Sequence, residues 1–190
     1  MVVAGMVLVV AGCGGTPSPE DYFGNVAEET GAYGQALDEL RNAYAADLKD
    51  ELSSLADRTD FTNTAAVDAY FVQAKEVAIV KTADLLSDAG AELRNALDAL
   101  EELEPPEELA VEHEDVITSG ETLAASMPSS IEALRNLSSI EELQETFETT
   151  AYSVAAQRFA IACENLEQAA RSRGIDVAFV CPGGVDRPMG

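Results

Sequence analysis

A strict seven-residue repeat of large apolar side chains is the feature that most constrains the fold of this chain. The repeat occupies Val72, Ile79, Leu86, Leu93 and Leu100. Residues at this interval stay on one face of a helix and are typical of helices that pack along a long seam with slight supercoil. The sequence therefore predicts a helix over residues 64–104, packed in a bundle and ended by Pro105-Pro106.

Other apolar periodicities predict an all-α fold, an elongated up-down helical bundle of about four main helices. The further helices are expected over residues 21–57, from 109 to near Pro128 with a short extension over 130–137, and over 139–173. Two capping boxes, Ser129–Glu132 and Ser138–Glu141, are expected to start the extension and the last helix. Short turns make neighbouring helices antiparallel, so residues 58–63 and 127–139 are expected at one tip.

The last helix is expected to be the most buried because it carries two apolar stripes. One stripe runs through Leu143, Phe147, Val154 and Ile161, and the other through Phe159, Cys163, Leu166 and Ala170. Gly174 is expected to end this helix. Apolar and other residues then alternate over 175–181, which predicts a short strand-like return segment, with a disordered tail over 182–190.

Composition limits the partners that the chain can have. Its 190 residues include 35 acidic and 11 basic side chains, a net charge of −24. Nucleic acids and anionic lipid surfaces repel such a body, so no nucleic-acid partner is expected. Aromatic residues are only 6% of the chain, and with abundant Ala, Leu and Glu this favours helices.

An apolar run over residues 1–10 leads into Val10-Ala11-Gly12-Cys13, which resembles the lipobox of bacterial secreted lipoproteins. The run is too short to span a bilayer. The resemblance implies that residues 1–12 are a cleaved signal peptide and that Cys13 carries a lipid, with palmitate as the expected kind of acyl chain. Residues 13–20 then form a lipidated, flexible spacer, and the protein is anchored in the cell membrane and faces the extracytoplasmic side.

The two remaining cysteines, Cys163 and Cys181, form an even pair in a compartment that is expected to be oxidising, so they are predicted to form a disulfide. The descent along the helix from Cys163 covers about 15 Å. An extended return to Cys181 covers about 20 Å, so the two sulfurs can meet. The expected clasp therefore ties residues 175–181 to the bundle at residues 21–174.

Residues that carry chemistry are sparse. His113 is the only histidine and falls on the apolar face of its helix, so a hydrogen-bonded, partly buried side chain is expected. The weak candidates for a metal site are His113, Glu112, Glu108 and Asp115, although neighbours on one helix point in different directions. No metal, cofactor or catalytic motif is present, so we expect neither an enzyme nor a cofactor.

Two further patterns are similar to those of uncharacterised bacterial lipoproteins with helical bodies. They are Leu97-x-x-Leu100-x-x-Leu103-x-Pro105-Pro106-x-x-Leu109 followed by His113, and Ala162-Cys163-x-x-Leu166 leading to Gly174-Ile175-Asp176-Val177 and Cys181. The similarity implies an extracytoplasmic helical bundle and no particular activity.

Two functions remain open. The first is a non-enzymatic binding or scaffolding module, anchored through Cys13, for an unknown protein or small-molecule partner. The alternative is a cation- or solute-binding lipoprotein that uses His113 and the acidic turn between the second and third helices.

Overall fold

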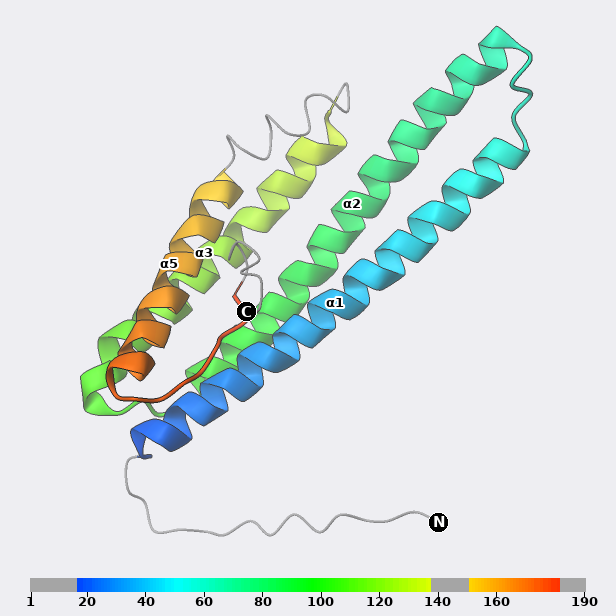
Figure 1. The fold of residues 1–190 in the computed structure, drawn as a ribbon. Helices are drawn as coiled ribbons and strands as arrows, with labels where there is room; N and C mark the ends of the chain where they lie inside the picture. The colour runs from blue at the N-terminus through cyan, green and yellow to red at the C-terminus, as the bar shows by residue number, and fades with distance from the viewer. Residues whose placement is uncertain (1–16, 138–150, 182–190) are drawn as a thin grey trace, which may run out of the picture.

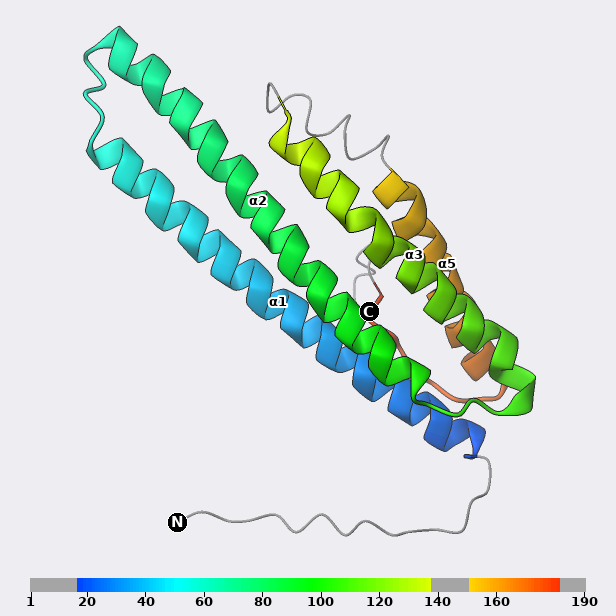
Figure 2. The ribbon, with the colours of Figure 1, turned by 180° about the vertical axis from the view of Figure 1, so that it is seen from behind.

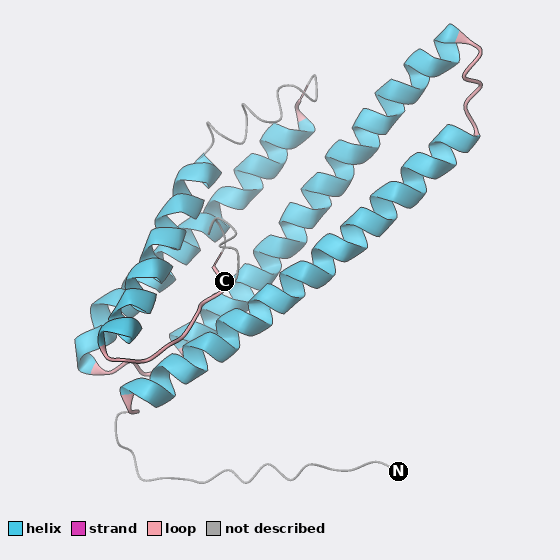
Figure 3. Cartoon of the chain, viewed as in Figure 1, coloured by secondary structure: helices cyan, strands magenta, loops and turns pink. Residues whose placement is uncertain are grey.

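The computed structural model describes residues 17–137 and 151–181, and in these residues the fold is all-α (Figure 3). Its elements are α1 (Pro19–Asp57), α2 (Thr64–Glu101), the short 3-10 helix η1 (Glu107–Leu109), α3 (Ala110–Arg135) and α5 (Ala151–Ser172). Successive long helices run antiparallel, as Figures 1 and 2 show from opposite sides. The predicted up-down helical bundle is therefore confirmed. The lipobox, the expected helix start at 139 and the tail from 182 lie outside the described residues.

The first two helices begin at side-chain caps. The hydroxyl of Ser18 accepts a hydrogen bond from the backbone N–H of Asp21 (3.2 Å), and Pro19 occupies the first turn, where its missing N–H costs nothing. The Asn63 side chain likewise accepts from the N–H of Ala65 (2.9 Å). The cap at Ser18 places the start of α1 two residues before the expected start. At its other end, α2 stops three residues before its expected end.

Pro128 does not end α3, which is the main correction to the predicted helix boundaries. The helix continues through Pro128 to Arg135, with Met127 and Leu134 both buried. Packing on both sides of the proline thus outweighs the backbone hydrogen bond that it removes. The expected capping box at Ser129 is also wrong, because this hydroxyl donates to the Ser126 carbonyl inside the helix.

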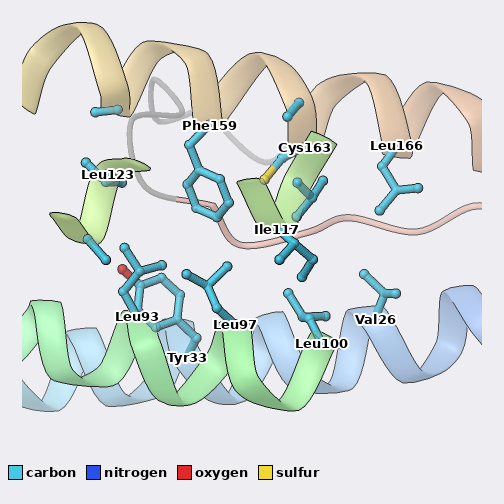
Figure 4. Packing of buried hydrophobic residues seen from close by; sticks show 14 of the residues in the cluster. Val26, Tyr33, Leu93, Leu97, Leu100, Ile117, Leu123, Phe159, Cys163 and Leu166 are labelled. Atoms are coloured by element: carbon cyan, nitrogen blue, oxygen red, sulfur yellow. The ribbon is translucent and has the colours of Figure 1, made fainter. Parts of the chain in front are cut away.

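The core lies where all four long helices run side by side. The repeat on α2 supplies Leu93 and Leu100 to this core, and the side chains between the helices interdigitate in Figure 4. Other large members come from every long helix: Tyr22, Phe23, Val26 and Tyr33 on α1, Leu97 on α2, Ile117 and Leu123 on α3, and Phe159 and Leu166 on α5. Each fully buried side chain of this size contributes about 1.5–3 kcal/mol of transfer free energy, so this half of the molecule holds most of the stability.

Only one of the two apolar stripes predicted on the last helix is buried. Phe159, Cys163, Leu166 and Ala170 face the core, as expected. Val154 and Ile161, from the other stripe, are about half exposed. The prediction that this second stripe also faces a neighbour is therefore wrong for its described residues.

The return segment over residues 175–181 lies between α5 and α1 (Figures 1 and 2). It is extended but forms no strand in the described residues. The ring of Phe179 stacks on the ring of Phe23 of α1, with 6.4 Å between the ring centroids. The backbone N–H of Phe179 donates a hydrogen bond to the Glu167 carboxylate of α5 at 2.8 Å. The predicted disulfide between Cys163 and Cys181 is confirmed. This segment consequently links the α1–α2 pair to the α3–α5 pair.

The α1–α2 hairpin projects beyond α3 and α5 (Figures 1 and 2). Gly90 packs against Met127, and Gly120 against Leu97, which fixes the antiparallel register of α2 and α3. In this register Arg135, at the end of α3, falls opposite Thr82. Helix α2 therefore extends past α3 by about 27 Å, and residues 58–63 form the tip without residues 127–137 beside them.

No helix in the described residues is both long and apolar enough to cross a membrane.

Candidate functional site

The distal hairpin, which we define as residues 45–83, is the part of the fold with least cover. Leu55 and Ala83 are the only described residues of the hairpin that are buried, whereas the other half of the molecule holds the core. Two helices cannot bury both of their flanks against each other. Apolar side chains in this part consequently remain accessible to a partner.

Three aromatic rings gather at the tip of the distal hairpin. Phe61, in the turn, lies 5.5 Å from Tyr70, which in turn lies 5.4 Å from Phe71, and both pairs meet edge to face. Phe61 is 56% exposed and Phe71 is 64% exposed. In a chain with so few aromatic residues, exposed rings in contact with one another form an apolar projection of the kind that anchors protein interfaces.

A groove lies beside this aromatic tip, between α1 and α2. It consists of two adjoining hollows, of about 310 Å³ and about 270 Å³, which share Leu55, Arg58 and Gln73. The remaining lining residues are mostly small or apolar, and all but Thr59, which lies in the turn, are on the two helices shown in Figure 1: Thr59, Ala66, Ala69 and Tyr70 in one hollow, and Glu51, Ser54 and Val77 in the other.

Polar contacts hold the base of the distal hairpin together. The hydroxyls of Tyr44 and Thr82 lie 3.1 Å apart, joining α1 to α2 near the end of α3. One turn further on, the Lys81 ammonium lies 2.8 Å from a Glu51 carboxylate oxygen and 3.6 Å from one of Asp47. The hydrogen bond to Glu51 raises the pKa of Lys81. The two helices are thus fixed relative to each other where the cover of α3 stops.

Charge is distributed unevenly between the distal hairpin and the rest of the chain. All three lysines, Lys49, Lys75 and Lys81, lie in the hairpin. With Arg58 they partly balance seven acidic residues, which gives the hairpin a net charge of −3 against −21 for the remainder. The aromatic tip is therefore on the less acidic of these two parts, where an apolar contact meets less repulsion.

His113 is a structural residue at the opposite end of the molecule. It is buried in α3, and its Nδ1 lies 2.9 Å from the hydroxyl of Tyr22 on α1. Burial lowers the pKa of His113, with Glu114 acting in the opposite direction. Burial raises the pKa of Tyr22, and Glu112 adds to that rise. The pair consequently ties α1 to α3 in its neutral form. The hydrogen bond and the burial of this histidine agree with the expectation from the sequence.

The weak metal candidates do not come together. Glu108 and Asp115 are exposed, Glu112 is half-buried, and His113 is directed toward Tyr22. Within the described ranges no three His, Cys, Asp or Glu side chains are close enough to hold a metal ion. The acidic turn between α2 and α3 thus offers isolated carboxylates.

A further hollow of about 270 Å³ lies between α3 and α5, lined in part by Asp115, Arg158 and Ile161. Its hydroxyl groups are directed to their own helix, since Ser119 donates to the Asp115 carbonyl and Thr122 to the Thr118 carbonyl. The hollow is shallow and its polar side chains do not converge, so it is a weaker candidate than the hairpin tip.

Sequence reasoning treated Phe61 only as part of a turn and did not single out Phe71. The sequence does contain a sign of this cluster, because three of the 11 aromatic residues, Phe61, Tyr70 and Phe71, fall within eleven positions.

Comparison with family models, curated proteins and solved structures found no match.

Proposed function

We propose that this protein is a membrane-anchored extracytoplasmic lipoprotein and that its helical bundle is a non-enzymatic protein-binding module. The sequence Val10-Ala11-Gly12-Cys13 supports the lipid anchor. The exposed aromatic cluster of Phe61, Tyr70 and Phe71 supports the binding role, and it is the single observation that carries the proposal.

The arrangement suits a module that reaches away from its membrane. The described chain starts at the end of the bundle opposite the hairpin tip (Figure 1), so an anchor at Cys13 would leave the aromatic rings far from the lipid surface. Helix α1 alone, at 39 residues, is about 58 Å long. The acidic remainder of the chain keeps the body off anionic headgroups.

Site-specific photo-crosslinking in intact cells tests the binding role. A photoreactive amino acid replaces Phe71 in the full-length chain, and a matched control carries it at Val111, which is slightly more exposed and lies on α3. We expect ultraviolet light to attach a protein to the Phe71 position and not to the Val111 position. Equal yields of crosslinked protein at both positions, or none at Phe71, would contradict the proposal.

A further inference from the structure

We propose that the return segment is a redox-sensitive cover: the Cys163–Cys181 disulfide holds residues 175–181 over the seam between α1 and α5, and reduction of this bond by a dithiol releases them while the four-helix core stays folded. The binding role of the distal hairpin plays no part in it. Three features support this device: the few contacts that hold the segment, the position of the disulfide, and a core that does not need the segment.

The return segment fills a seam that the helices themselves do not close. The main helix contacts join α1 to α2, α2 to α3 and α3 to α5. The segment passes between α1 and α5 in both views of the fold (Figures 1 and 2). Its Phe179 ring stacks on the fully buried Phe23, and its Val180 side chain lies on Gly34. Release of the segment therefore opens this part of α1 to solvent.

The backbone of the return segment has little to hold it beyond the end of α5. The cap of α5 fixes its first residue, because the N–H of Ile175 donates to the Ala170 carbonyl at 3.1 Å. Over residues 176–181 the structure gives one backbone hydrogen bond to the described helices, from the N–H of Phe179 to the Glu167 carboxylate. The segment also pairs with no strand in the described residues. Its position consequently depends on its side chains and on the disulfide.

The side chains of the return segment are only partly buried. Ile175, Val177 and Phe179 pack on the core but keep some exposure, and residues 176, 178 and 180 between them are exposed. Each residue that is fixed in an extended conformation loses backbone entropy, and the longer side chains lose rotamer freedom as well. Three partly buried side chains and one hydrogen bond return less free energy than seven ordered residues lose. The tether at Cys181 removes much of that loss, so the disulfide decides whether the segment stays bound.

The disulfide has one accessible side. Cys163 is 4% exposed and Cys181 is half-buried, so Cys181 offers the more accessible sulfur to a thiolate. Attack there forms a mixed disulfide with Cys181 and breaks the bond to Cys163, whose thiolate takes up a proton. The second thiol of the reductant then displaces Cys181, which also becomes a thiol. The dithiol is thereby oxidised to a disulfide, and the protein gains two electrons and two protons.

The four-helix core does not depend on the return segment. Gly90 packs against Met127 and Gly120 against Leu97, so α2 and α3 are joined without any residue of the segment. Reduction is therefore expected to open the seam between α1 and α5 and to leave the helices in place.

A tryptophan at position 179 tests the release. The chain contains no tryptophan, so Phe179→Trp in the full-length protein places a single indole ring over the seam. On reduction with dithiothreitol we expect its emission to shift to longer wavelength. Its quenching by acrylamide should rise to that of the control Phe71→Trp, which is exposed in either state and should not change. Circular dichroism should show unchanged helix content.

Two results of this experiment would overturn the proposal. Unchanged emission after complete reduction, verified by mass, would show that the return segment stays bound without the disulfide. Loss of helix content on reduction would show that the core needs the segment.

Proteolysis of the unsubstituted protein gives a second measurement that does not require the tryptophan variant to fold. Chymotrypsin should cut after Phe179 about tenfold faster or more in the reduced protein, since cleavage follows the population of the open form. The buried Phe159 of α5 should remain uncut in both states. Equal rates of cleavage after Phe179 in oxidised and reduced protein would contradict the release.

Discussion

Gly34 on α1 lies directly against Val180 of the return segment. A Cβ placed on Gly34 would be 2.6 Å from Cγ1 of Val180, well inside van der Waals contact. The absence of a side chain at this position therefore lets the segment lie on α1, one residue before Cys181 forms the disulfide with Cys163. Of the glycines in the first half of α1, Gly24 and Gly31 have open space where a Cβ would be.

Gly34→Ala is predicted to destabilise the protein relative to Gly31→Ala. Both substitutions gain up to about 1 kcal/mol of helix propensity, but only the Gly34 variant must displace Val180, an overpacking cost of about 1–3 kcal/mol. Thermal or urea unfolding of the two variants measures the difference. Adding Val180→Ala to Gly34→Ala should recover most of the loss, and no recovery in this double variant would show that the contact is not the cause.

Cys181→Ala is predicted to lower the free energy of unfolding by about 3 kcal/mol while leaving helix content nearly unchanged. The disulfide closes a loop with a sequence separation of 18, and its loss frees the unfolded chain. Cys181 is preferred to Cys163 as the site of substitution because Cys163 is buried and its truncation would also leave a cavity. Urea unfolding followed by circular dichroism gives both quantities. Two free thiols in the denatured, unreduced wild-type protein would contradict the pairing.

The His113–Tyr22 pair predicts a loss of stability in mild acid. Burial places the pKa of folded His113 below the value of about 6.5 that the unfolded chain has. Between these two values the unfolded state binds more protons, so the free energy of unfolding falls as pH falls below about 6.5. Urea unfolding at a series of pH values between about 7 and 5 measures the slope. His113→Gln should lose this part of the slope and keep the part due to carboxylates, and an unchanged slope would exclude His113 as its source.

Cys13→Ser is predicted to release the protein from membranes, because the thiol is the expected point of lipid attachment. Cell fractionation followed by a high-salt wash measures the membrane-bound share. Cys181→Ala serves as the control, since it also removes a thiol but should leave the protein in the membrane fraction. Retention of the Cys13→Ser protein in washed membranes would contradict the lipid anchor.

The sequence predicted those parts of the fold for which a pattern has a single physical explanation. The spacing of Leu93 and Leu100 predicted their burial, and the positions of Cys163 and Cys181 predicted the disulfide. Pro128 was misread because its helix is held by burial on both sides, which local propensity does not contain. The exposed state of Ile161 shows the same limit, since periodicity tells which residues share a face but not whether a neighbour covers it.

The features around the candidate site depend on contacts between helices that are far apart in the sequence, which local patterns do not reveal. The partner of His113 is 91 residues away, at Tyr22, so local pattern could predict a buried, hydrogen-bonded histidine but not which residue it bonds. The aromatic tip is a functional candidate only because α3 ends opposite Thr82. The point of α2 that this end faces is set by packing between the two helices, which the apolar periodicity of either helix does not contain.

The return segment also has a consequence for the order of assembly. Helices α1, α2 and α3 pack against their neighbours in the sequence, so these contacts are available as soon as each helix has left the ribosome. The link between α1 and α5 depends on Phe179 and Cys181, which follow every helix that the structure describes. The link between the two helix pairs therefore closes last, and the bundle stays open and reduced until those residues have been made.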